Sequence, residues 1–107
     1  MINKLNQVKE ALLTVTKEVY HYEAYKRSDE YIVWAEESEV RAIYYNNKKE
    51  QQVIQGTIDY FTKKEGDTTV DAIQEALTAY GISFYLNSVQ YEDETQYIHY
   101  EWIFEVI

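Results

Sequence analysis

The chain has 107 residues, of which 46% are hydrophobic and 27% are charged, and it contains no Cys and no Pro. This length fits a single domain, residues 1–107, with one core of its own. The absence of Cys excludes disulfides, thiolate metal sites and cysteine nucleophiles. No apolar run is long enough to span a bilayer, and residues 1–20 lack the apolar stretch of a signal peptide, so we expect a cytosolic protein.

The net charge of −9 is unevenly distributed along the chain. Residues 1–64 hold all 10 Lys and Arg against 10 Asp and Glu, whereas residues 65–107 hold nine acids and no base. A surface of that sign repels phosphate, which argues against ordinary binding to nucleic acid or membranes. It suits a basic partner, or a surface that nucleic acid must pass without adhering.

Residues 2–19 predict an amphipathic helix, because their apolar residues recur at spacings of three and four. Residues 20–24 and 31–35 alternate and are aromatic, which predicts two strands of a hairpin joined by the polar residues 26–30. Residues 36–39 carry three Glu and no apolar residue, and we expect them to interrupt the strand structure. A further strand is expected at Val40–Tyr45.

The middle of the chain predicts a loop, a strand and a second helix. Residues 46–50 have the composition of a solvated loop, and residues 52–62 predict a strand with Ile54, Ile58 and Tyr60 on one face. Gly56 in that strand indicates a bulge or a close backbone approach. A helix follows, with Thr68 and Asp71 resembling a capping box and Gly81 at the C′ position.

The last 26 residues predict a long hairpin whose register follows from burial. A loop with an odd number of residues pairs Leu86 with Trp102 and Phe84 with Phe104, and so keeps the large apolar side chains on one face. The same register pairs Val89 with His99. The expected fold is therefore α+β, an antiparallel sheet of four to five strands with two helices.

A catalytic role is not expected. His99 and Glu101 on one strand face could form a metal or acid–base pair, but a strand histidine beside a solvated carboxylate is the commoner arrangement, and His21 is equally ordinary. Glu92, Asp93 and Glu94 lack the spaced ligands of a calcium loop. Three scattered glycines build no phosphate-binding loop. We expect no enzyme activity, no cofactor and no metal site.

The 12 tyrosines have two explanations, cover for a small sheet or contact with other proteins. Residues 36–41, followed by residues 46–50, form either a mobile loop or an arm that becomes ordered on assembly, with Tyr44 and Tyr45 as its anchors and Lys48 and Lys49 meeting the acids of a neighbour. The residues proposed for such an interface are Glu36, Glu37, Glu39, Arg41, Tyr44, Tyr45, Lys48 and Lys49.

Three stretches resemble small proteins from the head–tail morphogenesis regions of tailed phages and prophages, described as minor capsid, tail completion or tail terminator proteins. They are residues 31–36 (YIVWAE), 47–63 (NKKEQQVIQGTIDYFTK) and 86–106 (LNSVQYEDETQYIHYEWIFEV). The resemblance implies an α+β protomer that forms a ring, commonly of six, at the end of the tail tube or in the neck, with tail-tube and head-connector proteins as partners and DNA passing through its lumen. It also implies a virion component, assembled in the cytoplasm of the bacterial host.

The charge asymmetry then suggests that Glu92, Asp93 and Glu94, at the tip of the last hairpin, face the channel and keep DNA mobile by repulsion. The alternative is an acidic, phage-encoded inhibitor that mimics DNA and binds a basic protein. In neither case do we expect a membrane, a small-molecule substrate or a specific nucleic-acid sequence as a partner.

Overall fold

The computed structural model describes the backbone of residues 2–43 and 50–107, and the side chains of residues 4–39 and 53–107. Its two helices and five strands follow the order expected for the α+β fold. They are α1 (Ile2–Leu13), β1 (Val19–His21), β2 (Glu30–Ile43), β3 (Glu50–Thr62), α2 (Thr69–Ala79), β4 (Ser83–Tyr91) and β5 (Ile98–Val106). Neither described helix is long and apolar enough to cross a membrane.

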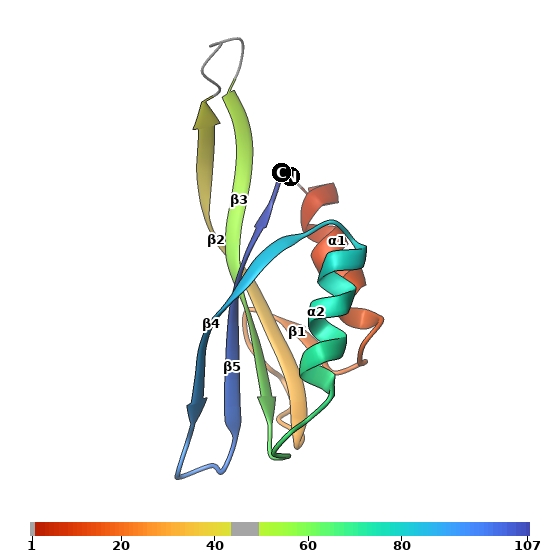
Figure 1. The fold of residues 1–107 in the computed structure, drawn as a ribbon, viewed down its shortest axis with the longest axis vertical. Coiled ribbons are helices and arrows are strands. Elements are labelled where there is room, and N and C mark those ends of the chain that lie inside the picture. Colours follow the sequence, from red (N-terminus) through yellow and green to blue (C-terminus); the bar gives the residue numbers. More distant parts are fainter. Residues whose placement is uncertain (1, 44–49) are drawn as a thin grey trace.

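The five strands form one twisted sheet in the order β1-β2-β3-β5-β4. Both helices lie on the same side of it, so the sheet has a covered face and an open face (Figure 1). Successive side chains of a strand alternate between the two faces. Every strand pair is antiparallel except β1 and β2, which are parallel.

The hairpin expected from residues 20–24 and 31–35 is therefore wrong. The first strand ends at His21 because Tyr22 has a positive φ of 74°, and the chain then crosses over to enter β2 in the same direction as β1. The first helix is also shorter than expected and ends at Leu13, where the hydroxyl of Thr14 donates a 2.6 Å hydrogen bond to the carbonyl of Ala11.

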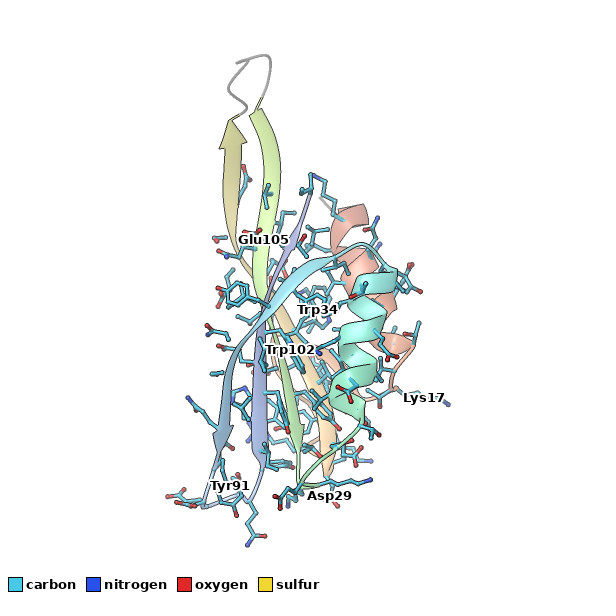
Figure 2. All side chains as sticks on the ribbon, viewed as in Figure 1. Lys17, Asp29, Trp34, Tyr91, Trp102 and Glu105 are labelled. Atoms are coloured by element: carbon cyan, nitrogen blue, oxygen red, sulfur yellow. The ribbon has the colours of Figure 1, made fainter. Side chains whose placement is uncertain are left out.

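The core lies between the covered face and the two helices. Its largest fully buried side chains are Trp102, Tyr60 and Phe104 from the sheet and Leu12 from α1. The indole N–H of Trp102 donates a 3.0 Å hydrogen bond to Gln74 of α2 and so joins the helix to the sheet. Figure 2 labels Trp102 between the sheet and α2. Ile54, Ile58 and Tyr60 of β3 are all buried here, as their alternation predicts.

β2 runs without interruption through the acidic residues 36–39, contrary to expectation, and includes residues 40–43 of the expected further strand. Its register against β3 shifts between Glu36 and Ser38, so Glu37 is the extra residue of a β-bulge. The bulge lies opposite Gly56. A Cβ on Gly56 would lie 2.1 Å from the Ala35 carbonyl oxygen and 2.7 Å from the Phe104 ring, which confirms the expected close approach.

α2 begins differently from the expected capping box, because the Thr68 side chain makes no capping hydrogen bond. The carboxylate of Asp67 accepts instead, from the Thr69 N–H at 2.9 Å. At the other end, the N–H of Gly81 bonds the Thr78 carbonyl and that of Ile82 bonds the Leu77 carbonyl, a Schellman motif with Gly81 at φ 71°. The C′ role expected of Gly81 is confirmed.

In the C-terminal hairpin, the pairs Phe84–Phe104 and Leu86–Trp102 form as predicted. Nearer the turn the register shifts between Leu86 and Ser88, so Val89 pairs with Tyr100 and not with His99. A bulge at Asn87 therefore replaces the expected odd loop, and six residues, 92–97, connect the strands. Burial of the apolar residues fixes the register only where the helices cover the strands.

Candidate assembly surface

β4 is the outer strand of the sheet along its whole length. It carries no charged residue and no Pro. Four of its apolar or aromatic side chains are exposed, by 57% at Tyr85, 43% at Leu86, 51% at Val89 and 60% at Tyr91. Leu86 is on the face expected to be buried, but the helices do not cover this edge. β4 thus presents an uncharged, apolar edge to solvent.

At the other edge, β2 and β3 continue past the end of β5 as a two-stranded ribbon. The pairing of β3 with β5 ends at Ile54 and Val106, whereas residues 50–53 of β3 pair with β2 only. The ribbon projects at one end of the molecule, and the turn between β4 and β5 lies at the opposite end (Figure 1). The molecule is elongated, with extents of 50 × 24 × 23 Å.

This arrangement separates the two groups of residues that the sequence analysis proposed for assembly. Glu36, Glu37 and Glu39 lie on β2 around the bulge, where the ribbon leaves the sheet. Arg41 belongs to the ribbon backbone, but its side chain lies outside the described set, as do Tyr44, Tyr45, Lys48 and Lys49 altogether. The expected arm anchored by the two tyrosines therefore stays a prediction.

The acidic tip forms the turn between β4 and β5. Asp93 and Glu94 are exposed, whereas Glu92 is held inward and accepts a 3.0 Å hydrogen bond from the Thr95 hydroxyl. An oxygen of Glu92 lies 3.8 Å from Nδ1 of His99. Two of the three proposed carboxylates are thus directed to solvent, and the third takes part in the local structure.

An aromatic cluster covers the adjacent part of the open face. The rings of Tyr31 and Phe61 stack at 4.8 Å, those of Phe61 and His99 stack at 4.2 Å, and Tyr97 meets both Tyr31 and Phe61 edge-on. The Tyr97 hydroxyl donates a 2.6 Å bond to the Ser28 carbonyl, and the Lys63 ammonium lies 4.9 Å from the Tyr97 ring centre. The cluster joins three strands on the face that no helix covers.

His99 does not pair with Glu101, the partner considered from the sequence. Its Nε2 lies 2.6 Å from Oδ1 of Asp59 on the neighbouring strand β3, while Glu101 accepts a 2.8 Å bond from Asn87. The bond with Asp59 raises the pKa of His99, although burial acts in the opposite direction. No sequence signal marks Asp59 as the partner, because the pairing depends on β3 and β5 being neighbours in the sheet.

His21 has a similar environment on the covered face. Its ring stacks on Tyr22 at 4.1 Å and on Trp34 at 4.0 Å, and its Nε2 lies 2.6 Å from Glu36. Burial would raise the pKa of Glu36, but hydrogen bonds, first among them that from His21, lower it. Both histidines therefore join neighbouring strands, His21 through Trp34 and Glu36 on β2 and His99 through Phe61 and Asp59 on β3. Among the described residues, no group of three His, Cys, Asp or Glu side chains is placed to hold a metal ion.

In the structure, acidic and basic side chains lie mostly on different elements. Within residues 30–39, 53–62, 83–91 and 98–106, the strands contain seven acids and no Lys or Arg. Asp59, Glu101 and Glu105 alternate on the open face with apolar residues such as Ile103. Seven bases with described side chains lie instead on α1 and in the connections: Lys4, Lys9, Lys17, Lys26, Arg27, Lys63 and Lys64. Within these ranges the sheet is acidic, and the bases with described side chains lie outside it.

Comparison with known proteins adds one finding about the fold. No family model and no curated protein sequence matches the chain. Among solved structures, it is similar to a chain of the virion of a native gene transfer agent particle, with a TM-score of 0.54 and 13% sequence identity. The superposition covers 92% of this chain and 89% of the other. The two chains share their fold over nearly their whole lengths.

Proposed function

We propose that the chain is a structural component of a phage-like virion, acting at the head–tail interface or the tail end as an oligomeric ring. The observation that carries the proposal is the similarity of fold to a virion chain, which extends over 92% of this chain and 89% of the other. The resemblance of residues 31–36, 47–63 and 86–106 to head–tail morphogenesis proteins supports the same role.

The charge distribution supports a role beside DNA without adhesion to it. DNA presents a dense row of phosphates, so a wall of carboxylates without bases repels it. The open face provides Glu101 and Glu105, and the tip adds Asp93 and Glu94. Asp59 is paired with His99, and the bases Arg27 and Lys63 lie beside the aromatic cluster at one end of this face. In the proposed ring, the carboxylates of the open face and the tip face the channel, and the more basic α1 side faces away from it.

The proposal includes no covalent chemistry. The two histidines, which are the most plausible acid–base groups, are each held between an aromatic ring and a carboxylate on neighbouring strands. These contacts give them a structural role, joining β1 to β2 and β3 to β5. In the proposed function the protein acts through its shape and charge, as one of the head–tail or tail-end proteins.

A deletion in the native host tests the role. Particle production is induced in strains with and without the gene, the particles are purified, and the protein is detected by mass spectrometry and the particles by electron microscopy. The expected result is the protein in intact particles, and separate heads and tails, or tails of irregular length, in its absence. Normal particles from the deletion strain, together with a stable complex between the protein and a basic protein, would favour the DNA-mimic alternative.

A further inference from the structure

The sheet has two outer edges that no described strand covers. On one side, β1 pairs only with Ile32, Val33 and Trp34, so β2 becomes the outer strand beyond that point. On the other side, β4 is the outer strand throughout. The residues 35–43 of β2 are called the β2 edge here, and Ser83–Tyr91 the β4 edge.

The β4 edge lacks most of the usual protection of an outer strand. Such strands avoid pairing with other chains through charged side chains, Pro, bulges or shortness. β4 has nine residues, none of them charged and none of them Pro, and its one irregularity is the bulge between Leu86 and Ser88. A long, uncharged outer strand is a template for another strand.

The β2 edge has the opposite character. It contains Glu36, Glu37 and Glu39 against a single base, Arg41, and like charges placed opposite one another destabilise a strand pair. Two β2 edges are therefore poor partners, whereas an uncharged strand meets no repulsion there. The ribbon that carries this edge has only two strands, an arrangement of marginal stability in water unless a further strand or surface supports it.

We propose that the β4 edge of one copy pairs with the β2 edge of a second copy, so that the sheets of neighbouring subunits become continuous. This pairing would be the subunit interface of the ring proposed above, and the number of copies in the ring rests on that proposed function. Because β2–β3, β3–β5 and β5–β4 are each antiparallel, β4 runs opposite to β2. A second copy in the same orientation therefore presents its β2 antiparallel to β4.

The offset between the two edges favours closure into a ring. Ser83 pairs with Glu105, Glu105 with Gln55, and Gln55 with Ser38, so Ser83 and Ser38 lie at the same level along the sheet. β4 is therefore level with residues 30–38 of β2, whereas the β2 edge extends beyond that level to residue 43. Measured on β3, the centres of the two edges differ by four to five residues, or roughly 15 Å along the strands. Four strands span about 19 Å across the sheet, which gives a strand tilt of about 40°, within the range found in closed sheets. An interface between two different edges forms rings when the rotation closes.

Cysteine cross-linking tests the pairing, because the chain has no Cys of its own. Ser38 pairs with Gln55 and Ser88 with Glu101, so both serines lie on the open face, one at each edge. The double variant S38C/S88C is treated with a short thiol-to-thiol cross-linker, both in concentrated solution and in purified particles. S38C/S28C is the matched control, since Ser28 lies in the connection between β1 and β2.

The expected result is a ladder of cross-linked multimers from S38C/S88C and monomers from the control and from each single variant. Dimers from S88C alone would mean that two β4 edges pair with each other, and would overturn the proposal. The absence of a ladder in both settings would also overturn it. If the protein is present in particles but gives no ladder, the edge pairing fails while the virion role stands. If the protein is absent from particles, the virion role fails, and a ladder in solution still supports the pairing.

Two substitutions of opposite charge at Val89 give a second measurement. This side chain is 51% exposed, so V89E and V89K should unfold at nearly the same temperature as the parent. In the S38C/S88C background, V89E places a carboxylate beside the acidic β2 edge, and V89K places an ammonium there. V89E should reduce the multimer yield several-fold and V89K should preserve it. Equal reductions by the two variants would indicate self-pairing of β4 and overturn the proposal.

Discussion

The two faces of the sheet are stabilised by different interactions. The covered face holds Trp102, Phe104, Ile58 and Tyr60, all without exposed surface, against the two helices. The open face is stabilised by an aromatic stack and the His99–Asp59 pair, and it also carries the carboxylates of Glu101 and Glu105. The covered face therefore determines the stability of the fold, and the open face is available for contacts with other molecules.

The largest effect is expected on the covered face, at Gly56. In G56A, the new methyl group would collide with backbone atoms of Ala35 and Glu36 and with the Phe104 ring. Overpacking typically costs 1–3 kcal/mol, and because backbone must move here we expect a loss of about 3 kcal/mol or more in the free energy of unfolding. Urea unfolding followed by tryptophan fluorescence measures it.

Gly66 provides the control for G56A. It has a positive φ of 68° and no atom near an added Cβ, so G66A carries only the cost of the left-handed backbone, about 1 kcal/mol. If G66A destabilises the protein as much as G56A does, the close approach at the bulge is not the cause.

The next largest effect is expected at Asp67, the buried carboxylate beside the covered face. Its oxygens accept hydrogen bonds from the hydroxyls of Tyr60 at 2.6 Å and Thr62 at 2.8 Å, and from the Thr69 N–H. Burial would raise its pKa, but these bonds outweigh burial and lower the pKa from 3.8 to about 2. That difference corresponds to roughly 2 kcal/mol of stability at neutral pH, which D67N should lose.

The pH dependence separates the contribution of the Asp67 charge to stability from that of its hydrogen-bond geometry. Because the folded pKa is depressed, the contribution is fully present above the unfolded pKa of 3.8 and is lost as the pH falls toward 2. The difference in unfolding free energy between wild type and D67N should therefore shrink between about pH 4 and pH 2. A difference that stays constant over this window would attribute the effect to lost hydrogen-bond geometry alone.

These residues also mark how far the sequence predicts the structure. Alternating apolar residues are enough to place Ile54, Ile58 and Tyr60 on the covered face, because burial strongly favours one face. The register of Phe84 and Leu86 also follows, because their partners Phe104 and Trp102 are fully buried. The role of Asp67 as a buried hydrogen-bond acceptor was not predicted, since its partners Tyr60 and Thr62 on β3 come close to it only in the folded sheet. The sequence pattern marks the N-terminus of a helix there, but it does not show which oxygen accepts.

The open face and the edges were predicted less well, for the same physical reason. The acidic residues 36–39 suggested an interruption, yet their side chains extend from a ribbon and an edge where charge has little cost. The bulge at Asn87 moved Val89 away from His99 because near the turn no helix covers the strands. The proposed interface residues Glu36, Glu37 and Glu39 do lie at an outer edge, and the role of that edge stays a prediction.

A smaller effect is expected for His99 on the open face. Its pKa is raised by the bond with Asp59, so it stabilises the fold most when protonated. A raised folded pKa means that the contribution is fully present below the unfolded value of 6.5 and is lost as the pH rises through the higher folded value. H99Q should cost about 1 kcal/mol at pH 6 and less at alkaline pH, measured by urea unfolding. A cost that grows with pH would contradict this assignment.

The smallest effect on stability, and the sharpest separation of the two faces, is expected for the double variant E101Q/E105Q. Glu105 is exposed, and a glutamine at position 101 can still accept the hydrogen bond from Asn87, so the unfolding temperature should change little and the free energy by less than about 0.5 kcal/mol. If the open face lines a DNA channel, removing two carboxylates per subunit should slow DNA ejection or lower infectivity, more strongly at low salt, where charge is less screened. The matched control is E75Q, on α2 at the opposite side of the sheet. Particles carrying either variant are compared by ejection assays at two salt concentrations. Equal behaviour of the two would place the channel elsewhere, while a defect confined to E101Q/E105Q would assign the uncovered side of the sheet to the lumen.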